Sequence, residues 1–398
     1  MLTYGSTVYE KGATVAHSLR GHMGDTLFFS SIRTFLDSMK YKDVSSQQMC
    51  DILSGISGIE LQGFSDSWVF TPGYPHFSVD SFLVVPNGGN YYVTVFLREK
   101  LRGRTTYSQN LQFELTFMDQ QWNKHTVLTE FDGPYLTKSF TIPINPSIVM
   151  VDAEERSLDA TTDNYKTLKA VQVYDFPTTY FSGTVMSIAD SAFVRVEHNW
   201  VAPDTLKTMI PGLFISTERY WKIDGLFPDS INLKGKFTYN KSTASSGWLD
   251  NILMTNVADS LVLLYRPSTA SDWQIISTTR TGGSSSGYLY AENIAKGEYA
   301  LGIWDWDRYL SSPTVKLEKN KITLFPNPAS SNVVISSKNQ MLDSIEVYSN
   351  SGKKVFSTNQ KLNSKIFNMD VTSFSKGFYF VIAHLSGGKT AVVKLIVE

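Results

Sequence analysis

The feature that most constrains the fold of this chain is a change in the spacing of apolar residues at Pro72-Gly73. Before this point, apolar residues recur every three or four positions, which is the period of an amphipathic α-helix. From Tyr74 onward they recur at every second position, which is the period of a half-buried β-strand. Proline interrupts a helix and glycine permits a sharp turn, so this pair ends the helical part. We therefore predict a multidomain protein that is α-helical over residues 1–73 and all-β thereafter.

The first predicted helix carries the residue of greatest chemical interest. Thr7 and Glu10 have the T-x-x-E spacing of a capping box, which makes Thr7 a predicted N-cap. Tyr9 then falls in the first turn, beside unpaired amide groups and the positive end of the helix dipole. A phenol in that position can donate a hydrogen bond to a developing oxyanion, and a tyrosine that only packs at the helix start is the alternative. The apolar stripe of this helix is formed by Val8, Gly12, Val15, Leu19 and Met23.

Three more helices are predicted before residue 73. Asp25 is the predicted N-cap of the second, and Ser45 with Gln48 forms a capping-box pair at the start of the third. The fourth is short and ends before Pro72-Gly73. The buried stripes of these three helices are predicted to be Phe28, Ile32, Phe35, Leu36 and Met39; Met49, Ile52, Leu53 and Ile56; and Leu61, Phe64 and Trp68.

The β part divides into three predicted domains. Residues 74–151 are predicted to form an immunoglobulin-like β-sandwich, with clean alternation over 111–117. A polar connector is predicted over 152–168, and a second antiparallel β-sandwich over 169–310. Its predicted strands include 192–197, 230–239, 260–265, 273–277 and 298–304. A separate small β-sandwich is predicted over 318–398, where strand and turn signals recur every 8 to 12 residues.

Composition excludes several classes of partner. The chain has 36 Lys and Arg against 37 Asp and Glu, a net charge of −1, so no nucleic acid partner is expected. The single Cys50 cannot form an internal disulfide and is expected to be a buried thiol. No apolar run is long enough for a transmembrane segment. The first residues lack the apolar run of a signal peptide, so we expect the chain to be a fragment of a longer protein.

The N-terminal motifs resemble a family of zinc peptidases. Tyr9-Glu10-Lys11-Gly12-Ala13, followed by helices and then by Trp68-Val69-Phe70-Thr71-Pro72-Gly73-Tyr74-Pro75, resembles the aminopeptidase N family, the gluzincins. The resemblance covers about residues 4–80. It implies that Tyr9 is a catalytic residue, which donates a hydrogen bond to the tetrahedral intermediate formed on a peptide substrate. It also implies that residues 1–73 are the end of a gluzincin catalytic domain.

The metal ligands of that family are not found in this sequence. The resemblance implies zinc held by H-E-x-x-H, but no histidine pair in the chain has that spacing. His17 and His22 are five residues apart, which turns them to different faces of a helix. Glu197 and His198 are neighbours in a predicted strand, so we expect a solvent-facing acid beside a packed imidazole. We assign no metal or cofactor ligand to this chain, and place zinc in the complete parent protein.

The C-terminal residues resemble a secretion signal. Phe325-Pro326-Asn327-Pro328 is followed by Asn350-Ser351-Gly352-Lys353 and by Gly377-Phe378-Tyr379-Phe380-Val381. This order is similar to the C-terminal sorting domain of the type IX secretion system of Bacteroidota-type bacteria. It implies that residues 318–398 engage the type IX secretion machinery and its sortase, and that the protein is secreted or held at the outer cell surface of a Gram-negative bacterium.

These observations predict the C-terminal portion of a secreted zinc aminopeptidase-like metallopeptidase. Because this chain lacks H-E-x-x-H, we expect it to be inactive alone. The alternative is an exported, non-catalytic β-sandwich protein with a binding or scaffold role and a degenerate peptidase remnant.

Overall fold

The structure is a computed structural model that describes residues 7–228, 230–243, 249–255, 260–305, 308, 322–338, 340–349, 353–358 and 360–398. The chain separates into two compact units, Met1–Asp305 and Trp306–Glu398. Each unit has its own hydrophobic core, and each is described by itself. In the part of the chain that is described, no helix is long and apolar enough to cross a membrane.

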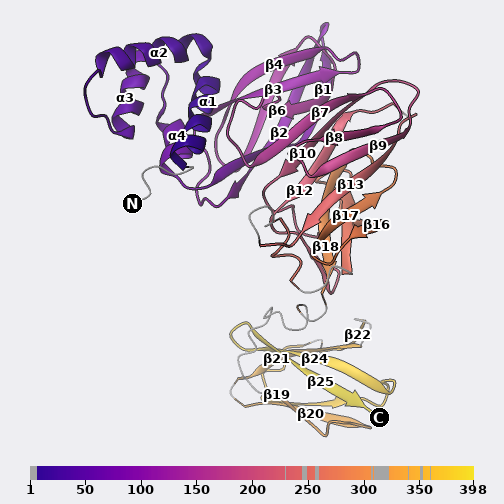
Figure 1. Cartoon of the computed structure of the whole chain (residues 1–398). Coiled ribbons are helices and arrows are strands. Elements are labelled where there is room, and N and C mark those ends of the chain that lie inside the picture. Colours follow the sequence, from indigo (N-terminus) through magenta and orange to yellow (C-terminus); the bar gives the residue numbers. More distant parts are fainter. Residues whose placement is uncertain are drawn as a thin grey trace. The chain divides into compact units, whose positions relative to one another are not determined.

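The first unit begins with a group of helices, drawn in indigo in Figure 1. The predicted helical segment is confirmed, and the capping box of Ser45 and Gln48 is present with both hydrogen bonds. Two caps differ from the prediction. Gly24, not Asp25, occupies the N-cap of α2, and Thr7 opens a π-helical turn instead of capping an α-helix. The elements are η1 (Thr7–Lys11), α1 (Gly12–Met23), α2 (Asp25–Ser38), α3 (Ser46–Ser57), α4 (Gln62–Ser65) and η2 (Asp66–Phe70).

The helices pack against a sandwich of two three-stranded antiparallel sheets, in the orders β1-β2-β5 and β4-β3-β6 (Figure 1). Leu53 and Trp68 from the helices and Phe77 and Phe113 from the strands belong to one buried cluster. The period change at Pro72-Gly73 therefore marks a change of secondary structure inside a single core. The strands are β1 (Tyr74–Asn87), β2 (Asn90–Arg102), β3 (Leu111–Asp119), β4 (Lys124–Phe131), β5 (Tyr135–Ile142) and β6 (Pro146–Val151).

A second pair of sheets follows, one of seven strands and one of five. The sheets enclose a core that includes Trp221, Phe237 and Leu263. All five predicted strands of this region are confirmed. The strands are β7 (Thr161–Leu168), β8 (Val173–Phe176), β9 (Phe181–Ser187), β10 (Ala192–Asn199), β11 (Leu213–Ile215), β12 (Tyr220–Leu226), β13 (Asn232–Asn240), β14 (Leu261–Arg266), β15 (Gln274–Ile276), β16 (Thr279–Gly282), β17 (Ser286–Ala291) and β18 (Gly297–Trp304).

Residues 152–168, predicted to be a connector, include one of these strands. β7 pairs with β10 along its whole length and forms an edge of the seven-stranded sheet. The sequence pattern did not predict β7 because this strand is polar, and an edge strand can carry polar side chains on much of its surface.

The second unit is a small sandwich with sheet orders β19-β20-β23 and β22-β21-β24-β25. The Asn327 side chain clamps the last strand: its amide donates to the Lys394 carbonyl at 2.7 Å, and its carbonyl accepts from the Ile396 amide at 2.8 Å. The motif residues Asn350, Ser351 and Gly352 lie outside the described residues. The strands are β19 (Ile322–Phe325), β20 (Asn332–Ser337), β21 (Leu342–Ser349), β22 (Lys354–Ser357), β23 (Ile366–Asp370), β24 (Gly377–Leu385) and β25 (Lys389–Val397).

Candidate active-site helix and its seat

Tyr9 lies in the single π-helical turn that precedes α1. Its side chain is 65% exposed, so it does not pack as a core residue at the helix start. The turn is joined to α1 by a hydrogen bond from the Thr14 hydroxyl to the Glu10 carbonyl, 2.5 Å long. A π-helical turn widens the backbone and is frequent at functional sites. The Tyr9 phenol is therefore exposed on a turn that is hydrogen-bonded to α1.

The two peptidase-like motifs meet in space. The Lys11 ammonium lies over the ring of Tyr74, 5.5 Å from its centre. Tyr74 is placed there by Gly73, which has φ of 78°, a conformation that favours glycine. A Cβ atom on Gly73 would lie 2.2 Å from the Arg102 carbonyl oxygen, so no other residue fits this close approach. The chain thus brings the start of α1 and the start of β1 together.

Helix α1 is held against the loop that follows β6. The Leu158 amide donates to the buried Ser18 hydroxyl at 2.8 Å, and that hydroxyl donates to the Thr14 carbonyl at 3.0 Å. His17 Nε2 lies 3.2 Å from the Glu155 carbonyl, within hydrogen-bond distance. These bonds anchor the helix that follows Tyr9.

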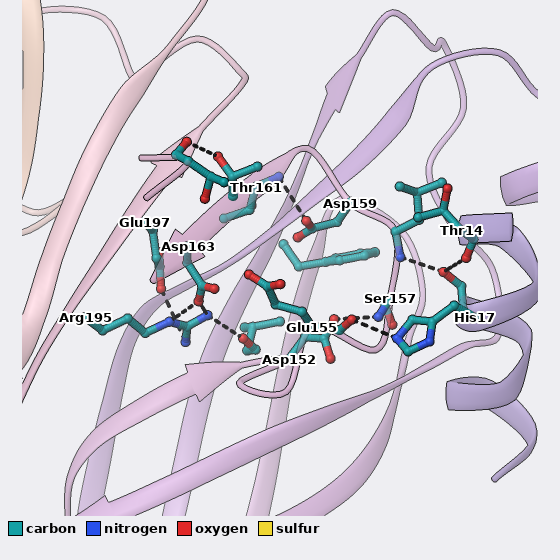
Figure 2. A pocket seen from close by; sticks show the side chains of 16 residues that line it. Thr14, His17, Asp152, Glu155, Ser157, Asp159, Thr161, Asp163, Arg195 and Glu197 are labelled. Atoms are coloured by element: carbon teal, nitrogen blue, oxygen red, sulfur yellow. Dashed lines mark hydrogen bonds and ion pairs between the residues drawn. The ribbon is translucent and has the colours of Figure 1, made fainter. Parts of the chain in front are cut away.

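Next to the contact between α1 and the loop after β6 lies a cavity of about 290 Å³ that is lined by many acidic side chains. Figure 2 shows Thr14 and His17 on the helix side, and Arg195 with Asp163 and Glu197 on the opposite side. The acidic residues of the lining are Asp152, Glu155, Asp159, Asp163 and Glu197. Tyr9 is not among the described residues that line this cavity, so the cavity supports α1 and does not include the phenol.

Burial raises the pKa of two of these carboxyl groups, Asp163 and Asp159. Burial raises the pKa of Asp163 to about 7 against the opposing charge of Arg195, and a hydrogen bond with Glu155 adds to the rise. Burial, together with the negative charge of Asp152, raises the pKa of Asp159 well above its ordinary value. The Arg195 guanidinium pairs with Asp163 and donates to the Val151 carbonyl at 3.0 Å. The cluster thus surrounds the buried Arg195, which pairs with Asp163 and Glu197, and includes carboxyl groups with raised pKa values.

The two histidines of α1 serve packing and anchoring. His22 is buried, packs against Phe64 with ring centres 5.3 Å apart and ring planes tilted by 50°, and accepts from the Gln112 amide at 3.4 Å. Burial lowers the pKa of His22, which keeps the ring neutral. His17 instead contacts the loop at Glu155, so the two rings have different partners, as their spacing predicted.

The predictions for the neighbours Glu197 and His198 have different outcomes. His198 is fully buried, and burial with the charges of Arg219 and Arg102 lowers its pKa well below the ordinary value, which confirms a packed imidazole. The prediction of a solvent-facing Glu197 is wrong. Its side chain is only 13% exposed and its carboxylate lies 3.5 Å from the Arg195 guanidinium, because it lies on the wall of the acidic cavity.

The zinc implied by the family resemblance does not fit the residues that the structure describes. Among them, no group of three or more His, Cys, Asp or Glu side chains is arranged to hold a metal ion. The described residues of the acidic cavity therefore lack the ligand arrangement of a zinc site.

Sequence reasoning missed the acidic cavity. Its signal was the run Asp152-Ala153-Glu154-Glu155-Arg156, which looked like a solvated connector. Asp152 and Glu155 both have positive φ, 45° and 50°, which turns the loop back so that its carboxyl groups face inward. Dense acidic residues between two β-domains were the only indication in the sequence.

Comparison with known proteins agrees with both resemblances. Residues 2–68 match the peptidase family M1 domain, and residues 323–398 match the secretion system C-terminal sorting domain. The chain is 32% identical to aminopeptidase N of Lactococcus lactis subsp. lactis over 73 residues, which are 18% of this chain and 9% of that protein. It is 23% identical to probable aminopeptidase 1 of Sulfurisphaera tokodaii over 171 residues, 42% of this chain and 21% of that protein.

The chain thus spans at most about a fifth of the length of these curated relatives. The second alignment is longer than the helical segment, so the similarity extends into the β-sandwich region. The N-terminal part of this chain is therefore a fragment of a peptidase family M1 (aminopeptidase N) domain, and its C-terminal part is a sorting domain for type IX secretion.

Proposed function

We propose that this chain acts as the C-terminal portion of a secreted zinc aminopeptidase-like metallopeptidase. In this proposal the Tyr9 phenol donates a hydrogen bond to the oxyanion that forms when water attacks a peptide carbonyl. The observation that carries the proposal is the exposed Tyr9 on an anchored turn, in a segment where the two family motifs meet at Lys11 and Tyr74. A fixed donor is more effective than a mobile one, because no reorganisation is needed as charge develops.

The surface of the helical segment supports a further protein part packing there. Phe29 and Leu36 are two turns apart on one face of α2, and both are exposed. The prediction that Leu36 is buried is therefore wrong: its side chain is 61% exposed. Tyr9 and Phe70 are exposed on the same segment. Exposed apolar groups on one segment are typical of a contact surface. We infer that the zinc-binding helices of the family cover it in the complete protein and face Tyr9.

The sorting domain supports the place of action. The chain carries this domain over residues 323–398, which indicates export by the type IX system. We propose that residues 318–398 contact the secretion machinery and its sortase, and that the protein reaches the medium or the outer cell surface of a Gram-negative bacterium. There it would act on peptides from their N-termini.

The test is Tyr9→Phe in the native exported protein that contains this sequence. Loss of one oxyanion donor should lower kcat about 100- to 1000-fold on an aminoacyl-p-nitroanilide, with the bound zinc unchanged by elemental analysis. Tyr41→Phe, at another exposed tyrosine of the helical segment, is the matched control and should retain full turnover. Unchanged turnover of Tyr9→Phe would remove the assignment of Tyr9.

The second candidate is an exported binding or scaffold protein without peptidase activity. It is favoured by one observation, a groove of aromatic and hydrogen-bonding side chains on the five-stranded sheet. This candidate predicts that the purified native protein releases no amino acid from any aminoacyl-p-nitroanilide. Hydrolysis that co-purifies with the protein and falls with Tyr9→Phe would exclude it.

A further inference from the structure

A second hollow lies on the outer face of the five-stranded sheet, away from the helical segment in sequence. The sheet has the order β16-β17-β13-β9-β8, and the hollow has a volume of about 440 Å³. Side chains from four of these strands and from the β8–β9 turn line it. The ones that carry the argument are Asp175, Tyr180, Ser182, Lys236, Thr238 and Tyr288.

Strand register explains why these side chains share one face. Lys236 of β13 is paired with Ser182 of β9, and Ser182 is paired in turn with Asp175 of β8. One step along, Thr238 is paired with Tyr288 of β17. Paired residues project to the same side of a sheet. The residues between them, such as Phe181, Phe237 and Leu289, project to the other side into the core.

The floor of the hollow contains a hydrogen-bonding group without a protein partner. Ser182 is only 4% exposed, and it lines the hollow. Within the described residues, its hydroxyl makes no hydrogen bond to the protein, and neither do the side chains of Asp175 and Thr238. The Ser182 hydroxyl is not one of the fully buried polar atoms that lack a partner, so its oxygen meets solvent in the hollow, where a ligand hydroxyl can replace water as its partner.

Aromatic surface borders these polar groups. The Tyr288 side chain is 39% exposed, and the Lys236 ammonium lies 4.9 Å from the centre of its ring. Tyr180, on the other side, is 37% exposed, while part of its ring is packed on His198, with ring centres 5.0 Å apart. The hollow therefore presents rings and hydrogen-bonding groups side by side.

The turn that places Tyr180 is strained and firmly held. Thr178 and Tyr180 have φ of 68° and 56°, values that non-glycine residues, and β-branched ones above all, rarely adopt. The Thr179 hydroxyl donates to the Phe176 carbonyl at 2.7 Å, and the buried Trp221 indole donates to the Thr179 carbonyl at 2.7 Å. The Thr238 amide donates to the Tyr180 carbonyl at 3.0 Å. Strain that the surrounding structure maintains is typical of a pre-organised binding site.

We propose that this hollow binds a neutral glycan made of pyranose sugars. A pyranose has a face of C–H groups that stacks on an aromatic ring, here Tyr288 or Tyr180. Its hydroxyls both donate and accept, which suits the carboxylate of Asp175, the ammonium of Lys236 and the hydroxyls of Ser182 and Thr238. One acid and one base balance in charge, which favours an uncharged sugar over a phosphate or a polyanion.

The glycan site would make the second sandwich a carbohydrate-binding module that holds the exported protein on a polysaccharide. The proposal does not depend on the peptidase assignment, because no residue of the hollow belongs to the helical segment. It is tested by binding, without any measure of turnover, so that its failure is distinguishable from the failure of the peptidase proposal.

The experiment is native affinity electrophoresis of the full 398-residue chain in gels containing soluble β-glucan, xylan or mannan, with isothermal titration using the matching oligosaccharide. At least one polysaccharide should retard the chain, and Tyr288→Ala should raise Kd by about tenfold or more. Asp175→Ala, a second variant at an exposed side chain, should also weaken binding. Tyr92→Ala is the matched control, since Tyr92 is 45% exposed on β2 of another sheet, and it should bind as the unchanged chain does.

Three results would overturn the proposal. The first is no retardation by any of the three polysaccharides. The second is retardation that neither Tyr288→Ala nor Asp175→Ala reduces, which would place the sugar elsewhere. The third is saturable binding of an unstructured peptide that both variants abolish in the absence of sugar binding, which would make the hollow a peptide site.

Discussion

At the scale of single residues, the first unit buries acidic groups whose protonation depends on their surroundings. Glu99 of β2 is one of them: its carboxylate accepts from the Ser108 amide at 2.9 Å and from the Ser108 hydroxyl at 3.0 Å. Burial raises the pKa of Glu99 to about 7, although these hydrogen bonds oppose the rise. The folded state therefore binds this proton more tightly than the unfolded chain, in which the pKa is near 4.5.

This difference predicts a pH-dependent contribution to stability. The stabilisation is fully present below about pH 4.5 and is lost as the pH rises through about 7, where the buried carboxyl must ionise. Glu99→Gln removes the titration, so its unfolding free energy relative to the unchanged chain should rise by up to about 3 kcal/mol from pH 4.5 to 8. Urea unfolding at both pH values measures it, with Glu154→Gln, at an exposed side chain, as the control for lost charge. A difference that stays constant with pH would contradict the prediction.

At the scale of elements, helix α1 is positioned by close contact with the loop after β6. Gly21 makes this possible, because a Cβ atom there would lie 2.8 Å from the Arg156 carbonyl oxygen and 2.9 Å from its Cβ. The helix therefore rests directly on the loop backbone. Since Tyr9 lies on the turn that leads into α1, this contact also helps to set the position of the phenol.

Gly21→Ala should move α1 away from the loop after β6. Alanine favours a helix over glycine by about 1 kcal/mol, but overpacking costs about 1–3 kcal/mol, so a net loss of stability of about 1 kcal/mol is expected. Gly55→Ala is the matched control, because Gly55 is also inside a helix but nothing lies within 4 Å of its added Cβ atom. The control should be neutral or stabilising in the same urea titration. Equal effects of the two substitutions would show that the loop at Arg156 accommodates the added methyl group without a loss of stability.

At the scale of the whole molecule, ion pairs join the two sandwiches of the first unit. Asp204 accepts from Arg98 of β2 at 2.7 Å and from Arg266 of β14 at 2.6 Å, and lies 3.0 Å from the Lys100 ammonium. Burial opposes ionisation, yet the bonds from Arg98 and Arg266 hold the pKa of Asp204 well below its usual range. The carboxylate therefore stays charged and ties the sandwiches together. The second unit has a separate core, built around residues such as Val347, Val381 and Leu395.

Separate cores predict separate unfolding transitions. Leu395→Ala in the second unit should cost about 2–5 kcal/mol there and lower the Tm of one calorimetric transition, leaving the other in place. Leu263→Ala, at an equally buried leucine of the first unit, should lower the other transition instead. A single transition that both substitutions shift would show that the units unfold together.

The sequence by itself was sufficient for the change from helices to strands near residue 73, for the strands with clear apolar patterns and for both family resemblances. These features depend on local patterns: apolar spacing, capping pairs such as Ser45 and Gln48, and short motifs with their own turns. Clean alternation over 111–117 was enough to predict β3, because one face of that strand is buried along its length. The role of Tyr9 stays a prediction, since it depends on a resemblance and on groups outside the chain.

Features that depend on residues far apart in the chain, such as strand pairing and cavities, could be determined only from the tertiary structure. Polar β7 became a strand because β10 pairs with it, and Glu197 became part of a cavity wall that α1 and the loop after β6 also line. The acidic cavity and the hollow under Tyr288 are formed by strand register and by residues with positive φ, neither of which a local pattern reports. Spacing along a chain shows which face a side chain occupies, but the partners of that face are chosen by packing.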